Sequence, residues 1–339
     1  MTTATENKPK ENVDYYDQVL PKKEPKFMTP IRRWEKRMGL VTPIVWTNAI
    51  ILTLLHVAVP GYTIYLLCHG IRCLRQTLIF QVLYGQMVGL GISCGIHRLW
   101  SHRTFKATTP LQILLLFFFS TTGQNNVFDW VRDHRVHHKM SETSADPHDS
   151  TRGFFFAHFG WLMMKKHPHV IEEGKKVDMS DITSDPILSF YNKHFMFFKI
   201  FCCFYLPTMV PVWFYGEELY IAFLATVLRF VYSTNITSSV NSFAHLYGMR
   251  PYNKHIAPVQ NIGVSILAYG EGWHNYHHAF PWDYKSAELP YFINVSTLFL
   301  DVAAYLGLAY DLKTASPSLI DAVAQSMGDN SRKHRKKEI

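Results

Sequence analysis

Residues 130–138 read WVRDHRVHH, and residues 272–278 nearly repeat this pattern as GWHNYHH. In each stretch, three histidines occur at offsets of zero, three and four residues. On an α-helix these offsets place three imidazoles on one face, about one turn apart. Neutral imidazole is a good ligand for iron, zinc, copper and nickel, so both stretches predict metal binding. The two triplets are His134, His137 and His138, and His274, His277 and His278.

Three further histidines extend the candidate ligand set to nine. His97 and His102 lie in HRLWSH, and His245 follows Asn241 by four residues in NSFAH, a spacing that puts the amide and the imidazole on one helical face. A closed zinc site needs only four donors. Nine imidazoles instead suit two metal ions with open coordination positions, and therefore oxygen chemistry. No Ser-His-Asp set, phosphate loop or Rossmann fingerprint accompanies them, so the electrons must come from a partner.

The chain contains 18 histidines, and those outside these clusters lack the spacing of ligands. We interpret them as structural or exposed, because a single histidine is more often one of these than a ligand. His148 and His158 are the two for which a role stays open, since they lie in the same polar segment as the second cluster.

The composition indicates a membrane protein with a polar domain. Of the 339 residues, 48% are hydrophobic and 15% aromatic, which excludes disorder for most of the chain. The mean hydropathy of −0.03 is high for a soluble protein and low for a pure membrane bundle. The net charge of +8 comes without a nucleic-acid motif, so it favours anionic lipid or an anionic substrate and no nucleic-acid partner. Five cysteines without a CxxC pattern argue against a disulfide framework.

Four apolar segments are long enough to cross a bilayer, which needs roughly 20 residues. They cover residues 45–67, 78–96, 194–215 and 219–240 and form two hairpins. Lysines and arginines precede the first segment and recur near the carboxyl terminus, whereas the turn between the third and fourth segments carries two glutamates. A turn with two arginines between the first pair is a small exception. The positive-inside rule therefore predicts that both termini and all histidine clusters are cytosolic.

Other apolar segments are not expected to cross. Residues 111–120 and 261–269 are too short, and residues 292–308 would bring Asp301 into lipid. We expect the first to form a buried or interfacial helix and the last to lie on the surface of the cytosolic domain. The sequence thus predicts an all-α membrane protein with four transmembrane helices in two hairpins, and a cytosolic helical cap that holds a dinuclear metal centre.

The ends of the chain differ from its centre. Residues 1–27 are polar and are expected to form a mostly flexible cytosolic tail, and residues 31–38 (IRRWEKRM) form a basic amphipathic segment that suits a membrane surface or a solvated helix. The predicted divisions are a cytosolic tail with this segment (1–42), a first transmembrane hairpin (43–97), the cap with the first two histidine clusters (98–193), a second hairpin (194–240), the cap with the last cluster (241–315) and a basic tail (316–339).

These residues resemble a known family. HRLWSH, DWVRDHRVHH and GEGWHNYHH, with NSFAHLYG, are similar to the histidine boxes of membrane acyl-CoA desaturases, and to animal stearoyl-CoA Δ9 desaturases in particular. The resemblance runs from about residue 43 to residue 310 and includes SETSADPHDSTRGFFFAHFGWL, RPYNKHIAPVQN and GLAYD. It implies four transmembrane helices under a cytosolic cap and two Fe2+ ions, with Asn241 holding one of them through a water. The implied iron ligands are His97, His102, His134, His137, His138, His245, His274, His277 and His278.

The resemblance also implies a reaction and its partners. The reaction is the O2-dependent insertion of a cis double bond between C9 and C10 of a saturated fatty acyl-CoA, stearoyl- or palmitoyl-CoA, which gives monounsaturated fatty acids for lipid synthesis. Cytochrome b5 and NADH-cytochrome b5 reductase supply the electrons, and no catalytic residue beyond the metal ligands is implied. The terminal KKEI resembles a dilysine signal of endoplasmic-reticulum membrane proteins.

The headgroup contacts implied by the family show two departures. Lys165 stands where mammalian relatives carry arginine, which replaces a forked contact by a point charge. Ser238 stands where they carry tryptophan, so that contact is not carried over. The headgroup residues that match are Asn125, Arg132, Asp133, Lys165 and Lys166.

A stripe of small residues leads to one of the ligands. Gly85, Gly89, Ser93 and His97 recur every four residues and share a helical face. This stripe predicts either a groove along which an acyl chain points at the metals or close helix packing through small residues.

Two alternative functions remain at this level. A lipid hydroxylase or a desaturase of another position shares the histidine boxes, although the absence of HPGG and the histidine at the head of the last box favour a Δ9 enzyme. A metal transporter would place its ligands inside the spans, near mid-membrane, whereas here they fall beyond the span ends.

Overall fold

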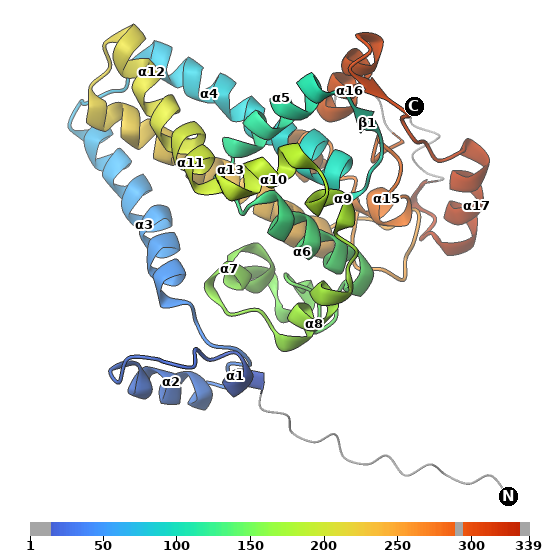
Figure 1. Ribbon diagram of the computed structural model, residues 1–339, viewed down its shortest axis with the longest axis horizontal. Helices are drawn as coiled ribbons and strands as arrows, with labels where there is room; N and C mark the ends of the chain where they lie inside the picture. The colour runs from blue at the N-terminus through green and yellow to red at the C-terminus, as the bar shows by residue number, and fades with distance from the viewer. Residues whose placement is uncertain (1–14, 289–293, 333–339) are drawn as a thin grey trace, which may run out of the picture.

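The computed structural model describes residues 15–288 and 294–332, and this part of the chain is mainly helical (Figure 1). Four helices are long and apolar enough to cross a membrane, which confirms the predicted fold class and the number of spans. Only one two-stranded antiparallel sheet, β1 (Lys106–Ala107) with β2 (Ala309–Tyr310), occurs in the described residues. The four spans are α3 (Trp46–Cys68), α4 with its continuation (Arg75–Ser101), α11 to α12 (Phe195–Tyr215) and α13 (Leu219–Leu246).

Two of the spans are longer than the sequence predicts. The second continues past α4 (Arg75–Leu90) as a π-helix, η1 (Gly91–Ser101), so the predicted end at residue 96 is too early. The fourth extends to Leu246, so Asn241 and His245 belong to the spanning helix itself. The first span passes through Pro60 without a break.

The third span is helical throughout despite its prolines. It consists of α11 (Phe195–Ile200), a π-helical turn η4 (Phe201–Tyr205) and α12 (Leu206–Tyr215). A π-turn changes the hydrogen-bond pattern of the backbone and leaves carbonyl groups in need of donors. Arg229 of α13 supplies one of these donors, because its guanidinium donates to the carbonyl oxygen of Cys203 at 2.6 Å.

Turns of the two hairpins meet at the end of the spans remote from the cap (Figure 1). The carboxylate of Glu217, in the turn before α13, accepts hydrogen bonds from the backbone N–H of Leu74 at 2.8 Å and from the thiol of Cys73 at 3.3 Å. Leu74 is the residue that precedes α4. The acidic turn of the second hairpin therefore caps a helix of the first.

The shorter apolar helices cover η1 without crossing. Helix α5 (Thr109–Ser120) packs along η1, and α16 (Val295–Tyr305) contacts it as well. With 12 and 11 residues, both are shorter than a bilayer requires. Asp301 accepts a hydrogen bond from the hydroxyl of Tyr284 at 2.7 Å, so its carboxylate has a partner in the cap. Residues 292 and 293, the first two of the predicted 292–308 segment, lie outside the described residues.

The cap is built from short helices beyond one end of the spans. Helix α6 (Val127–Met140) carries the second histidine cluster, and the side chain of Asn126 caps it by accepting from the N–H of Asp129 at 2.8 Å. Helix α15 (His274–Ala279) carries the last cluster. The others are η2 (Ser150–Arg152), η3 (Phe156–Gly160), α7 (Trp161–Met163), α8 (Pro168–Lys176), α9 (Ser180–Thr183), α10 (Pro186–Lys193), α14 (Ile262–Leu267) and α17 (Pro317–Met327).

The amino-terminal segment is more ordered than its polarity indicates. Part of the tail expected to be flexible forms helix α1 (Tyr15–Gln18), and the amphipathic segment forms α2 (Met28–Arg37). The hydroxyl of Tyr16 donates to the carboxylate of Glu35, which joins the two helices. Residues 1–14 and the KKEI sequence lie outside the described residues.

Candidate metal centre

Four segments bring the nine predicted histidines to one place. His97 lies on η1 and His102 follows its end, α6 and α15 each carry a triplet, and His245 lies near the end of α13. The π-helix explains the first pair. In a π-helix residues five apart are hydrogen-bonded neighbours, and the N–H of His102 donates to the carbonyl of His97 at 3.1 Å. Their ring centroids are therefore only 4.9 Å apart, a proximity that a regular α-helix would not give.

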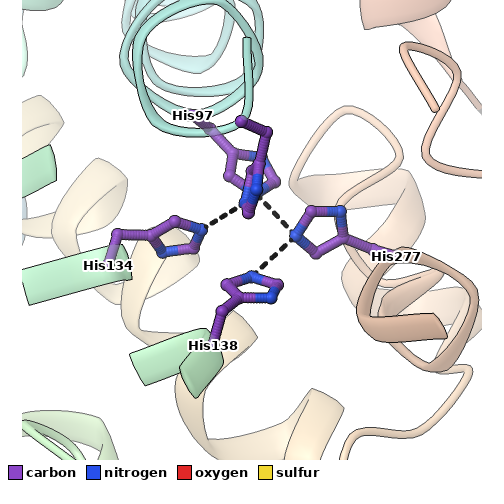
Figure 2. A group of neighbouring side chains, drawn as sticks. His97, His134, His138 and His277 are labelled. Carbon is purple, nitrogen blue, oxygen red and sulfur yellow. Dashed lines mark hydrogen bonds between the residues drawn. The ribbon is translucent and has the colours of Figure 1, made fainter. Parts of the chain in front are cut away.

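The histidines form two groups. In each group the ligand nitrogens lie within 4.8 Å of one another. In Figure 2, the rings of His97 from η1, His134 and His138 from α6, and His277 from α15 converge on a shared centre. The five-histidine group contains His97, His102, His134, His138 and His277, and the four-histidine group contains His137, His245, His274 and His278.

The short distances between imidazole nitrogens within each group are typical of nitrogens that face a shared metal ion. In the five-histidine group, Nε2 of His277 faces Nε2 of His97 and Nε2 of His138, both at 2.9 Å. In the four-histidine group, Nε2 of His274 faces Nε2 of His245 at 3.0 Å and Nε2 of His278 at 3.1 Å. Each ring nitrogen carries either one proton or one lone pair, so it cannot form two linear hydrogen bonds with two other ring nitrogens. A cation at each centre satisfies all of these lone pairs, so the donor sets fit two metal ions.

Carboxylates on the outer side of the rings fix their orientation. Nδ1 of His97 donates to Glu271 at 2.8 Å and Nδ1 of His137 donates to Asp146 at 2.9 Å. Nδ1 of His245 contacts Glu142 at 2.7 Å. Since each Nδ1 carries the proton, each Nε2 presents a lone pair to the centre, as in carboxylate–histidine–metal arrangements. Nε2 of His137 is buried and has no hydrogen-bond partner, as expected for a metal donor.

Electrostatics keep the rings in their ligand form. Burial and the neighbouring imidazoles hold the pKa of six rings well below the usual histidine range. These rings are neutral near pH 7, and neutral imidazole is the form that binds metal. The six are His102, His134, His138, His274, His277 and His278.

Glu271 pairs with a buried arginine and a serine hydroxyl in addition to its histidine. Burial alone would raise its pKa, but His97 and Arg98 lower the pKa of Glu271 to about 2. The guanidinium of Arg98 donates to Glu271 at 3.0 Å and is itself fully buried, and the hydroxyl of Ser93 donates to the same oxygen. This network joins the small-residue stripe of α4 and η1 to the metal centre.

Sequence reasoning missed the three carboxylates and the π-helix. The carboxylates lie in conspicuous places: Glu271 precedes the last histidine triplet, and Glu142 and Asp146 follow the second. His148 was left open and is buried with Nδ1 3.5 Å from Asp146, which makes it a neighbour of the four-histidine group. His158 contacts Ser242 at 2.8 Å and belongs to neither group.

Predicted headgroup residues are partly brought together. Asp133 lies between Arg132, whose guanidinium donates at 3.0 Å, and Lys166, whose ammonium group also contacts it. Asn125 and Lys165 are exposed and lie before α6 and before α8. Asn241 is half-buried on α13, one turn before His245, so the two share a helical face.

An elongated cavity of about 720 Å³ lies beside the metal centre. Residues of α3, α4, α13 and the turn after α14 line it, and most of them are apolar. One part reaches Ser93 and Glu271, next to His97, and another reaches Cys73, at the turn of the first hairpin. The cavity therefore extends through the membrane domain to the carboxylate and hydroxyl behind His97, while none of the nine candidate ligand histidines lines it.

Both predicted uses of the small-residue stripe occur. Gly85 lines the cavity, and a Cβ there would meet no atom closer than 3.9 Å, the Cγ of Arg229. At Gly89 the ring of Tyr269 occupies the space, and a Cβ would lie 2.1 Å from it. Gly85 therefore contributes open space, whereas Gly89 permits close packing.

Comparisons with known proteins agree with this geometry. The sequence profile named Fatty acid desaturase matches residues 75–292, more than half of the chain. The chain belongs to the fatty acid desaturase family. It is 47% identical over 290 residues to the Acyl-CoA Delta-9 desaturase of Acheta domesticus, an alignment that covers 85% of this chain and 80% of the relative.

Other relatives of this desaturase family have similar identities. The Acyl-CoA Delta(11) desaturase of Trichoplusia ni is 46% identical, with 85% of this chain and 82% of the relative covered. The Stearoyl-CoA desaturase 5 of Bos taurus is 46% identical, with 85% of each chain covered. The resemblance to the acyl-CoA desaturases is thus confirmed, and the position of the double bond is not decided by these identities.

Proposed function

We propose that this desaturase inserts a cis double bond between C9 and C10 of a saturated fatty acyl-CoA, stearoyl- or palmitoyl-CoA. The observation that carries the proposal is the apolar cavity whose lining includes Ser93 and Glu271, the residues that orient His97. An apolar space is suited to an acyl chain, and a cavity that extends to the carboxylate behind His97 would bring such a chain close to the metal centre. The nine histidines are the proposed ligands of two iron ions, with Asn241 contributing through a water.

The overall chemistry sets the demands on the site. Two C–H bonds of the substrate break and one π-bond forms, while O2 takes up the two hydrogens with two electrons and two protons to give two waters. When bound, the iron ions supply the activation of O2 that breaking an unactivated C–H bond requires. The chain holds the nitrogens in place, excludes bulk water with apolar walls and aligns the acyl chain.

The proposed headgroup site is the charged surface of α6 and the segment before α8. Arg132 and Lys166 share Asp133, so the carboxylate holds both cations in a defined position. Phosphates of coenzyme A are anions that such cations bind. We include Asn125 and Lys165 in the same site on the resemblance.

A Δ11 desaturase is the second candidate. Relatives named for position 9 and for position 11 have nearly the same identity to this chain. The position of the double bond depends on how many carbons fit between the headgroup contacts and the metals. A lipid hydroxylase with the same histidine clusters is a further alternative.

Cytochrome b5 and NADH-cytochrome b5 reductase are the proposed electron donors on the family resemblance, because the overall reaction consumes two electrons in addition to those from the acyl chain. The proposed location is the endoplasmic-reticulum membrane with both termini in the cytosol. The distribution of basic residues and the terminal KKEI support this location.

Expression in a yeast strain that lacks its own Δ9 desaturase tests the function. We expect growth without added unsaturated fatty acid, and cis-9 products in mass spectra that locate the double bond. Cis-11 products would replace the proposal by the Δ11 alternative, and hydroxylated products would show a hydroxylase. The matched control is His277→Ala, which should not support growth.

A further inference from the structure

Helix α2 has its ionic side turned toward the protein. Glu35 is completely buried, and its carboxylate accepts hydrogen bonds from the guanidinium of Arg32 at 2.9 Å, from the indole of Trp46 at 2.7 Å and from the hydroxyl of Tyr16. Arg32 also pairs with Glu24 at 2.6 Å. A buried and hydrogen-bonded network of this kind fixes the orientation of the helix.

The side of the helix next to this ionic side is apolar and exposed. Phe27, Trp34 and Met38 are 70%, 48% and 63% exposed, and Ile31 lies between them. Positions 27, 31, 34 and 38 form one stripe of a helix. A water-soluble surface helix buries such a stripe against its own protein, whereas α2 leaves it exposed.

Cations flank the exposed stripe. Arg33 and Arg37 are exposed, and neither has an ion-pair partner among the residues that the structure describes. Lys22, Lys23 and Lys26 are exposed just before the helix. An apolar stripe beside several cations is typical of a helix that lies in the interface of an anionic bilayer.

The position of α2 in the fold suits this interface. Helix α3, the first span, begins at Trp46, soon after the end of α2, and in Figure 1 α2 lies across the end of α3. The connecting segment is fixed to the cap, since the N–H of Val45 donates to Met163 at 2.7 Å and the N–H of Lys165 donates to Pro43 at 2.8 Å. The outer face of α2 is therefore held near the level at which the span enters the membrane.

We propose that the outer face of α2 docks on the surface of the bilayer, with Phe27, Trp34 and Met38 among the lipid chains and Arg33 and Arg37 on anionic lipid headgroups. A second copy of the chain is the less suitable occupant, because two such faces would bring like charges together. The segment that the docked helix holds carries Lys165, so the same surface supports the proposed headgroup site. The lipid contact itself does not depend on which reaction the enzyme performs.

Quenching of Trp34 fluorescence by brominated lipid tests the proposal. The full-length protein is placed in nanodiscs of brominated phosphatidylcholine with and without phosphatidylserine, and the signal of Trp34 is taken as the difference from Trp34→Phe. We expect strong quenching that increases with phosphatidylserine. In Arg33→Gln/Arg37→Gln the equilibrium constant for docking should fall about fivefold for each cation removed.

Controls separate docking from general damage. Lys175→Gln/Lys254→Gln removes two exposed cations of the cap and should leave the quenching unchanged. Phe27→Ser/Met38→Ser should reduce it in both lipids, while unchanged thermal unfolding shows that the variant is folded. An unquenched Trp34 would overturn the proposal, and paired chains within one disc would then identify a second copy as the occupant. Equal quenching with and without phosphatidylserine, or an unaffected double arginine variant, would also overturn it.

Discussion

The candidate metal centre and the cavity beside it differ in what determines their structure. In the metal centre, directional contacts determine each position, and carboxylates behind the rings hold His97, His137 and His245. The cavity has few directional contacts, and its shape depends on missing side chains, such as that of Gly85. We therefore expect changes in the centre to abolish the reaction, and changes in the cavity to alter which substrate reacts.

Loss of a ligand should have the largest effect. We expect His277→Ala and His278→Ala to remove one metal each, because they belong to different groups, and to reduce activity below detection. Metal content by mass spectrometry and product analysis measure both results. His255→Ala, at an exposed histidine outside the groups, is the control and should retain both metals. Full metal content in either ligand variant would contradict the assignment.

Removal of an orienting carboxylate should have a smaller effect that differs between the groups. We expect Glu271→Gln and Asp146→Asn each to reduce metal affinity by about 10–100-fold. Glu271→Gln should also destabilise the protein by about 3 kcal/mol or more, because it leaves the buried Arg98 without its carboxylate. Asp146 has no buried arginine or lysine partner among the described residues.

Metal titration and thermal unfolding separate these two effects. A larger stability loss in Asp146→Asn than in Glu271→Gln would contradict the role of Arg98. Equal metal affinity in the variants and the parent protein would show that the carboxylates do not orient ligands.

A bulky side chain in the cavity should change selectivity only. We expect Gly85→Phe to shorten the preferred acyl chain while the metal content stays constant, because Gly85 lines the cavity away from the ligands. Gly85→Ala is the matched control, since its Cβ finds ordinary contact at 3.9 Å. Product profiles from acyl-CoA substrates of graded length measure the effect. An unchanged profile in Gly85→Phe would exclude this part of the cavity from the acyl site.

Loss of a headgroup cation should have the smallest effect. We expect Lys166→Gln to raise the KM for acyl-CoA about two- to fivefold with little change in kcat, because the ammonium group is partly exposed to solvent. The difference should shrink at high salt, which screens such contacts. Steady-state kinetics at two salt concentrations measure it, and a fall in kcat alone would contradict a binding role.

Sequence spacing identified the two histidine triplets and the pair of Asn241 and His245, because these helical offsets convert directly into a shared face. His97 and His102 are five residues apart, and it is the π-helix that brings their rings together. The same reasoning could not find Glu142, Asp146 and Glu271, since each meets its imidazole only after separate segments pack. It also placed the end of the second span too early, because polar residues begin at His97, whereas the helix continues through His97 and Arg98 and buries both. Sequence reasoning also did not predict the ordered amino-terminal segment. Glu35 is a charged residue that hydropathy assigns to the surface, but it is completely buried in the fold.

The sequence by itself determined that the chain has four helices able to cross a membrane and carries two histidine triplets of ligand spacing. Both features are local, because hydropathy and helical periodicity are properties of neighbouring residues. Only the tertiary structure decided how the nine histidines divide into groups of five and four, which carboxylates hold them, and that a cavity reaches Ser93 and Glu271 behind His97. These contacts join residues far apart in the chain, and no local pattern specifies which distant side chains will meet.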